Sequence, residues 1–377
     1  MLIAAHHPSL NLLGITTIHG NASLENTTIN ATRVLEAIGR PEIPVYPGSK
    51  KPFCRPALHA PNIHGKCCHV STAAPRRNTN IISIMAGDSG LDGTDLLPKA
   101  SRAPITDKNP ILAMRDALMA QPKDTAWVVA TGTLTNVALL FATFPEVGEH
   151  IRGLTIMGGG VGEGFTDAPM SRLEGEENRI GNITPLAEFN LYCDPEASQA
   201  ICSDPIVAPK TTLITLDLTH QVLATSTVRN LVRHGVDDPS VEPTTLRQML
   251  YELLIFFAST YESVFGLASG PPLHDPLAVA VILSTLNPSY AKKHPEQALK
   301  FDDRDGERFA VNIITDGLHG TWGADPALVG ALGRSVAEPS PKGVCIPRGV
   351  DLDAFWAMIN DCIKRADACN AARKASA

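Results

Sequence analysis

The sequence lacks long apolar runs, basic tracts and a leader-like N-terminus. No apolar run in its 377 residues approaches the roughly 20 residues that span a bilayer. The net charge of −7 comes without a basic tract, which argues against nucleic acid or an anionic membrane as a partner. The N-terminal residues have no basic region and are interrupted by Pro8, so we expect no signal peptide and a cytoplasmic location.

Familiar cofactor and metal motifs are missing too. The glycine-rich stretch 158–164 gives no Gly-x-Gly-x-x-Gly in any register, and there is no Gly-Lys-Ser/Thr phosphate loop. An NAD-linked oxidoreductase is therefore the weakest of the interpretations kept open. The aspartates at 88, 92 and 95 resemble part of an EF-hand calcium loop. Lys99 stands at the twelfth position, where the loop needs a glutamate, and this excludes an EF-hand. The eight cysteines are scattered without zinc spacing, so we expect reduced, mostly packed thiols.

What is present indicates one globular α/β domain. Apolar residues make up 44% of the chain and charged residues 19%, as in ordinary globular proteins. Apolar runs rich in β-branched residues alternate with helical patterns, which predicts parallel strands joined by right-handed crossovers. The expected strands are 12–18, 43–46, 126–130, 153–157, 213–218 and 309–315, and the clearest helices are 25–38, 244–266 and 351–368. No linker is visible, so we expect a single domain over 1–377, a mainly parallel sheet with helices on both faces.

Several expected strands end in polar residues or glycine. Asn21 follows the first strand, Thr131 follows 126–130, and Met157 leads into three glycines. A polar loop then runs to Glu188 and Asn190. Ligands of open α/β sheets bind at the carboxyl ends of strands, so these residues predict a site for a small polyhydroxylated ligand.

The segment Pro271–Ala280 places a polar pair before an apolar helix. Pro276 suits the first helical turn, so His274 and Asp275 are expected at the helix start. Asp275 there can cap the helix, point into a cleft or bind a cation. Taken alone, the pair favours a capping aspartate beside a packed histidine.

The run from His274 to Ala280, His-Asp-Pro-Leu-Ala-Val-Ala, resembles the C-terminal signature of the inosine–uridine preferring nucleoside hydrolase family. The resemblance covers most of residues 2–330. It implies the nucleoside hydrolase fold and calcium-dependent hydrolysis of a ribonucleoside to ribose and free base. Family members are usually homo-oligomers, so the resemblance also implies a homo-oligomer.

The resemblance also implies roles for individual residues. The ribose hydroxyls would be held by Asn21, Asn182, Glu188 and Asn190, and Met157 would pack beside the sugar. The carbonyl of Thr131 and the carboxylate of Asp275 would coordinate calcium, while His274 would protonate the departing base and His64 would belong to a closing loop. Each position also has a plainer interpretation, because a lone Asn at a strand end caps turns and Glu188 could cap the following helix.

One part of the family pattern is missing. The family carries an Asp-x-Asp-Pro-Gly-x-Asp-Asp motif before its first helix, and Met1–Ala5 correspond to the inside of that helix. The first acidic residue is Glu25 and the first aspartate is Asp88, so the chain as written would lack its general base, at least two calcium carboxylates and the first strand. Our hypothesis is a truncated gene model. The alternative is a catalytically inactive ribose- or nucleoside-binding homologue.

Residues 66–87 interrupt the sequence that resembles the family. The stretch Gly65-Lys66-Cys67 can be encoded with a splice-donor sequence, and Asn78-Thr79-Asn80 with a branch-point sequence. We therefore interpret 66–87 as a non-homologous insertion. A translated intron and a real surface loop both remain open as its origin.

Overall fold

The computed structural model describes residues 1–58, 90–235, 238, 240–319 and 330–376. His64 and the expected insertion 66–87 lie outside the described residues. In the described part, no helix is both long and apolar enough to cross a membrane. The cysteines within these ranges are free thiols, and four are buried: Cys193, Cys202, Cys345 and Cys362.

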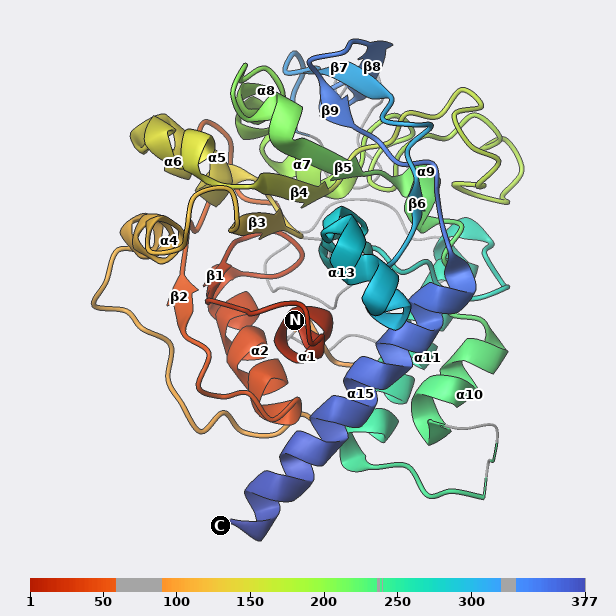
Figure 1. Cartoon of the computed structure of the whole chain (residues 1–377). Coiled ribbons are helices and arrows are strands. Elements are labelled where there is room, and N and C mark those ends of the chain that lie inside the picture. The colour runs from red at the N-terminus through yellow and green to blue at the C-terminus, as the bar shows by residue number, and fades with distance from the viewer. Residues whose placement is uncertain (59–89, 236–237, 239, 320–329, 377) are drawn as a thin grey trace.

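The main sheet has six strands in the order β3-β4-β5-β9-β7-β8 (Figure 1). Strands β3, β4, β5 and β9 run parallel to one another, whereas β7 pairs antiparallel with β8 and β9. The strands are β3 (Trp127–Ala130), β4 (Gly153–Met157), β5 (Thr211–Ile214), β7 (Arg308–Ile313), β8 (Ser335–Pro339) and β9 (Val344–Cys345).

Two small ladders lie outside the main sheet. β1 (Ile15–Thr17) pairs in parallel with β2 (Val45–Pro47), and β6 (Phe301–Asp302) pairs antiparallel with β10 (Gly349–Val350). Among the described strands, β1 therefore pairs with β2 and not with β3. The parallel part of the fold is split into two ladders.

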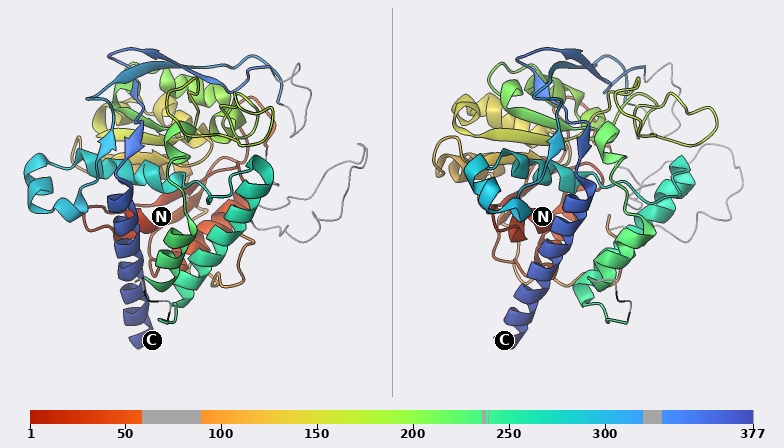
Figure 2. Two further views of the ribbon diagram at one scale, coloured as in Figure 1. Left: turned by 90° about the vertical axis from the view of Figure 1, so that its right-hand side faces the viewer. Right: turned by 45° about the vertical axis from the view of Figure 1, so that its right-hand side comes forward.

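Helices cover both faces of the main sheet (Figures 1 and 2). Val128 and Ala130 of β3 pack in one apolar cluster with α5 and α8, whereas Val129 packs in the other with α12 and α15. This alternation follows from the two-residue period of a strand. The fold class predicted from the sequence, a mainly parallel α/β sheet between helices, is confirmed.

The helices are bounded as follows. The α-helices are α1 (Leu2–His6), α2 (Leu24–Ala37), α4 (Pro110–Met119), α5 (Thr135–Thr143), α6 (Pro145–His150), α7 (Phe189–Cys193), α8 (Pro195–Cys202), α9 (Leu216–Thr219), α10 (Ser226–His234), α11 (Thr245–Phe265), α12 (Asp275–Ala280), α13 (Pro288–Lys293) and α15 (Leu352–Ala375). The 3-10 helices are η2 (Ala208–Lys210), η3 (Val281–Thr285) and η4 (Pro295–Gln297).

Capping side chains explain several of the helix ends. Ser23 accepts from Asn26 N at the start of α2, and Thr244 accepts from Arg247 N at the start of α11. α11 ends at Gly266, whose φ of 69° lies in the left-handed region that glycine adopts without strain. α15 is longer than the helix expected over 351–368 and carries the C-terminus away from the sheet (Figure 2).

The expected strand over 213–218 is wrong in its second half. β5 ends at Ile214, and the chain turns into the one-turn helix α9. The turn is fixed by three hydrogen bonds: Leu216 N donates to Gly159 O at 2.9 Å, and Asp217 accepts from Val161 N and Gly162 N. The apolar run in the sequence marks burial and does not distinguish a strand from a short helix.

A buried asparagine joins the small β1–β2 ladder to the main body. Asn136, on α5, donates from Nδ2 to Thr17 O at 2.9 Å, and its Oδ1 accepts from Ser49 N at 2.9 Å. The side chain is 4% exposed. One amide therefore gives the Ser49 N–H its acceptor and gives the Thr17 carbonyl, which already accepts from Gly48 N, a second donor.

We expect Asn136→Ala to lower the free energy of unfolding by about 2–3 kcal/mol, because a buried N–H would lose its partner. Urea denaturation measures this loss. The matched control is Asn287→Ala, which removes an exposed cap that accepts from Ser289 N and Tyr290 N and should cost about 1 kcal/mol. Equal losses in the two variants would contradict a joining role for Asn136.

Candidate functional site

The turn after β4 is held by five different hydrogen bonds. Gly158 N donates to Ile214 O at 3.0 Å, Gly159 N to Glu188 Oε2 at 3.0 Å and Gly160 N to Ser335 Oγ at 3.1 Å. The next two amides, of Val161 and Gly162, donate to the two carboxylate oxygens of Asp217, each at 2.8 Å. Every N–H from 158 to 162 is thus bound, which fixes the shape of the loop at this strand end.

Glycine is required at this turn for two reasons. Gly159 and Gly162 have φ values of +76° and +66°, a region that favours glycine. A Cβ at Gly160 would lie 2.6 Å from the carbonyl oxygen of Ile180. The glycine-rich stretch is therefore a close-packed corner of the site.

Four of the residues expected to contact the sugar meet beside this turn. Asn190 Nδ2 donates to the carbonyl oxygen of Met157 at 3.1 Å and approaches its sulfur at 3.3 Å. Asn182 Oδ1 accepts from Phe189 N at 2.9 Å, one residue before Asn190. Glu188 accepts from Asn190 N and Leu191 N as the cap of α7, so the plainer interpretation of Glu188 also describes what its side chain does.

Burial controls the charge of Glu188. The side chain is 2% exposed, and burial raises the pKa of its carboxyl to about 7. Three backbone N–H groups oppose this shift because they bind the ionised form, and the negative charge of Asp275 adds to it. Burial therefore favours the protonated form of Glu188 more than in an exposed glutamate.

His274 is bound on both ring nitrogens. Nδ1 lies 2.8 Å from Thr219 Oγ1, and Nε2 lies 2.6 Å from the hydroxyl of Tyr261. Thr219 Oγ1 also donates weakly to Leu216 O at 3.5 Å, which favours a His274 that donates from Nδ1 and accepts at Nε2. Burial, followed by the charges of Glu188 and Asp275, raises the pKa of Tyr261, so this phenol keeps its proton.

Asp275 is the first residue of α12, with Pro276 in the first turn and His274 as the N-cap. The N-cap residue, His274, makes no side-chain capping hydrogen bond. The side chain of Asp275 is exposed, yet the protein around its carboxylate withdraws it from bulk water, and this desolvation raises its pKa to about 6. The positive charge of the Met1 α-amino group opposes the shift.

Asn21 and Thr131 lie at neighbouring strand ends. Both line one cavity together with Asn190, and the strands that precede them meet there, because a Cβ at Gly132 would be 3.0 Å from the Ile18 side chain. In the described ranges, no group of three or more His, Cys, Asp or Glu side chains is arranged to hold a metal ion. Thr131 and Asp275 together supply two of the six to eight oxygens that calcium takes.

Sequence reasoning missed the short segment that supports these residues. Asp217 binds the turn after β4, Thr219 binds His274, and His220 Nδ1 lies 2.9 Å from the carbonyl oxygen of Pro169. Tyr261 was missed as well, although it lies on the expected long helix. The only signal was a polar residue at every second or third position in an otherwise apolar stretch, a pattern that surface-facing positions share.

The comparisons with known proteins agree with the fold. Residues 1–357 match the family model described as inosine-uridine preferring nucleoside hydrolase. The chain is 32% identical over 370 residues to the uridine nucleosidase of Saccharomyces cerevisiae, covering 97% of this chain and 92% of that protein. It is 27% identical over 367 residues to the Escherichia coli pyrimidine-specific ribonucleoside hydrolase RihB, with the same two coverages.

A solved structure shows the same architecture. The purine-preferring ribonucleoside hydrolase from Gardnerella vaginalis matches with a TM-score of 0.69 and 21% identity, covering 97% of this chain and 94% of that one. At this identity the likeness concerns the fold.

We expect Asp217→Asn to lower the free energy of unfolding by about 2 kcal/mol or more, because a carboxamide offers one acceptor to two N–H donors. Urea denaturation measures the loss, and hydrogen exchange should show faster exchange at Val161 and Gly162. The matched control is Asp204→Asn. A single oxygen of Asp204, Oδ1, accepts from Ile206 N and Val207 N, and the amide keeps that oxygen. Slow exchange at 161 and 162 in Asp217→Asn would contradict this role.

The stability of the protein should depend on pH through His220. Burial lowers the pKa of this histidine from 6.5 to about 4, against smaller opposing effects of Pro169 and Asp217. A depressed pKa in the folded state contributes stability above pH 6.5 that is lost as pH falls towards 4, about 3 kcal/mol in total. Denaturation of the wild type and His220→Gln at pH 7.5 and 4 should show the wild type losing this much more. Parallel losses in the two proteins would refute it.

Proposed function

The chain belongs to the inosine-uridine preferring nucleoside hydrolase family, and from that premise we propose that it is a calcium-dependent hydrolase that cleaves purine or pyrimidine ribonucleosides to ribose and free base. Ribonucleoside hydrolysis follows from the family. The calcium dependence and the residue roles below are our proposal. The observation that carries them is the meeting of Met157, Asn182, Glu188 and Asn190 at the fixed turn after β4.

These four residues suit a ribose. The hydrogen bonds within the protein use Nδ2 of Asn190 and Oδ1 of Asn182, so Oδ1 of Asn190 and Nδ2 of Asn182 are left for sugar hydroxyls. Met157 supplies an apolar wall at 3% exposure. Asn21 would bind a further hydroxyl from the end of β1. A fixed set of donors and acceptors of this kind holds the sugar in one orientation, and orientation contributes to the rate of the reaction.

On the leaving-group side, His274 and Tyr261 form a proton-donating pair. Water adds to C1′ of the ribose and releases one proton to solvent, while the bond from C1′ to the base nitrogen breaks and its electron pair stays on that nitrogen. The base then needs a proton. An imidazole and a phenol 2.6 Å apart can deliver that proton and share it between them.

Calcium would be held by the carboxylate of Asp275 and the carbonyl oxygen of Thr131. An exposed aspartate at the start of α12 with a raised pKa has the chemistry of a cation ligand. When bound, the ion would orient sugar hydroxyls and lower the pKa of water. Two protein ligands leave most of its shell to the sugar, to water and to groups outside this set.

That incomplete ligand set favours a second candidate function, which is nucleoside binding without turnover. One carboxylate and one carbonyl can support binding of a diol through a weakly held ion, whereas hydrolysis also needs an activated water. A cytoplasmic location and a homo-oligomeric state remain predictions of the sequence.

We expect Asp275→Asn to lower kcat/KM for uridine and inosine by about 10²-fold or more, measured as release of ribose. Calcium affinity, measured by titration calorimetry, should fall in parallel, and a chelator should abolish turnover by the wild type. Asp353→Asn, which changes an exposed acid in the first turn of α15, is the matched control and should leave both quantities unchanged.

Each outcome of this assay separates the candidates. Turnover that resists the chelator would contradict the calcium proposal. Nucleoside binding by the wild type without any release of ribose would establish the second candidate function instead.

A further inference from the structure

Two buried hydrogen bonds connect the turn after β1 with the starts of α5 and α8. Thr135, the first residue of α5, donates from Oγ1 to Asp194 Oδ2 at 2.6 Å. His19, in the turn after β1, has its Nε2 3.2 Å from the same Thr135 oxygen. The three side chains are at most 1% exposed, so bulk water does not compete for these bonds. We call this arrangement the His19–Thr135–Asp194 link.

The direction of both hydrogen bonds follows from the protons available. A hydroxyl has one proton, and Thr135 gives it to Asp194, so Thr135 Oγ1 can only accept from His19. Nε2 of His19 is therefore a nitrogen that carries a proton. Asp194 also accepts from two backbone N–H groups, of Phe53 at 3.0 Å and of Ala197 at 3.1 Å. The acceptor at the end of the link is thus held in place by the main chain of two segments.

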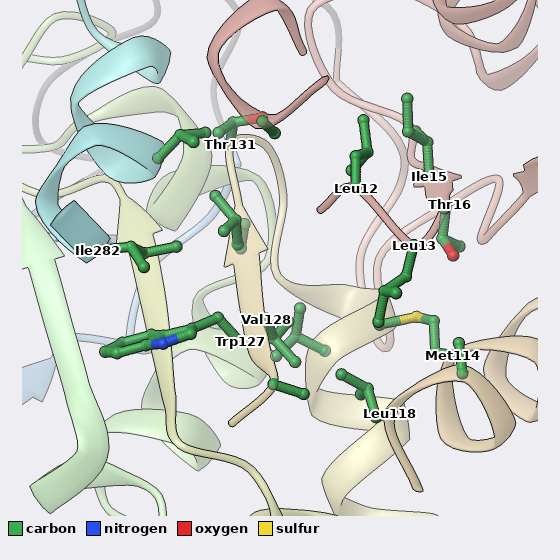
Figure 3. A pocket seen from close by; sticks show the side chains of 18 of the residues that line it. Leu12, Leu13, Ile15, Thr16, Met114, Leu118, Trp127, Val128, Thr131 and Ile282 are labelled. Atoms are coloured by element: carbon green, nitrogen blue, oxygen red, sulfur yellow. The ribbon is translucent and has the colours of Figure 1, made fainter. Parts of the chain in front are cut away.

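The link joins three segments that each carry a residue of the candidate site. These segments are the turn after β1, the loop from β3 to α5, and α7 with the start of α8. Thr131 lies just beyond β3, at the beginning of the second segment (Figure 3). Link members and site residues are near neighbours in sequence, in the pairs His19 and Asn21, Thr135 and Thr131, and Asp194 and Asn190.

Of these three site residues, Asn21 depends most on the link. The side chain of Asn190 is bound to Met157, and Thr131 would act through its backbone at the end of a strand that pairs with β4. The half-buried Asn21 lies beyond Thr17, the last residue of β1 that pairs with β2. Its position is therefore set by the turn and not by a ladder.

The ring of His19 ties that turn to the main body of the molecule. The main-chain bond from Gly20 N to Ala22 O, at 3.2 Å, lies within the turn itself. The bond from His19 N to Ser49 O, also at 3.2 Å, connects it to the segment after β2, which belongs to the same small ladder. The side chain of His19, by contrast, reaches α5 and through Thr135 the start of α8.

We propose that His19 and Thr135 are positioning residues for Asn21. The His19–Thr135–Asp194 link holds the turn after β1 so that the Asn21 side chain faces a ribose hydroxyl. This inference rests on the proposed function, in which Asn21 binds that hydroxyl. Neither His19 nor Thr135 touches the nucleoside in this arrangement. Their effect on the reaction comes from orientation, because a misplacement of about 1 Å can cost on the order of 10²-fold in rate.

A buried link also stabilises the fold, and a double-mutant cycle separates the two roles. If the link acts through Asn21, breaking it has little further effect on activity once the Asn21 side chain is gone. If the link acts only on stability, its loss has the same effect on activity whether Asn21 is present or not. The comparison therefore needs the same change in two backgrounds, the wild type and Asn21→Ala.

The test uses the full chain, uridine as substrate and release of ribose as the measurement. Thr135→Val keeps the shape of the side chain and removes the hydroxyl. We expect it to lower kcat/KM by about tenfold in the wild type and by less than about twofold in Asn21→Ala. Thr135→Ser restores the hydroxyl and should recover most of the activity. His19→Phe, which keeps a ring without the donor, is the second way to break the link and should give the same pattern.

The matched control is Thr28→Val. Thr28 is another buried threonine, on α2, whose hydroxyl lies 2.7 Å from Thr17 Oγ1 and donates to Leu24 O at 2.6 Å. Its loss should lower stability against urea about as much as Thr135→Val does, while kcat/KM stays within about twofold of the wild type.

The outcomes distinguish this inference from the proposed function. If the wild type binds uridine without turnover, the dissociation constant from titration calorimetry replaces kcat/KM in the same cycle. Equal effects of Thr135→Val in the two backgrounds, or an equal loss of activity in Thr28→Val, would overturn the positioning role and leave the proposed function standing. A wild type that neither binds nor cleaves nucleosides would overturn the proposed function and the positioning role together.

Discussion

The candidate site depends on the need to satisfy five consecutive backbone N–H groups at a buried turn. After β4, the amides from Gly158 to Gly162 donate to β5, to Glu188, to Ser335 and to both oxygens of Asp217. A turn bound from so many directions cannot shift without breaking a buried hydrogen bond somewhere. Because Asn190 is bound to Met157 immediately before this turn, the position of the Asn190 amide is set by backbone chemistry.

The one-turn helix α9 and the residue after it support several parts of the candidate site, although the helix is short. Asp217 holds the turn, Thr219 orients His274, and His220 holds Pro169 in the loop that carries Asn182. One segment of the chain therefore contacts both sides of the candidate site, the side of Met157 and Asn182 and the side of His274. Its polar groups face inward and are nearly all buried, so the two sides are positioned relative to each other by a common support.

Much of this arrangement could be predicted from the sequence, because strand ends of an open α/β sheet converge whatever the details. Met157, Asn182, Glu188 and Asn190 do lie together, and the strand 153–157 has the expected bounds. The rest could not be predicted. Leu216 starts a helix because its N–H donates to Gly159 O, a partner far away in the sequence. The hydrogen bond between Tyr261 and His274 depends on how α11 packs. Local patterns carry no information on such distant partners.

The division of the parallel strands into two ladders has a consequence for cooperativity. In one continuous ladder, opening any strand weakens its neighbours, so the sheet melts as a unit. Here β1, α2 and β2 are joined to the rest of the chain by side-chain packing and by single hydrogen bonds, among them those of Asn136, the His19–Thr135 contact and the bond from Ile105 N to Val45 O. The opening of one element destabilises a neighbour less when the two are joined by packing than when they share a ladder of hydrogen bonds. This N-terminal subdomain is therefore a separate unit of local opening, one that can exchange its amides while the six-stranded sheet stays closed.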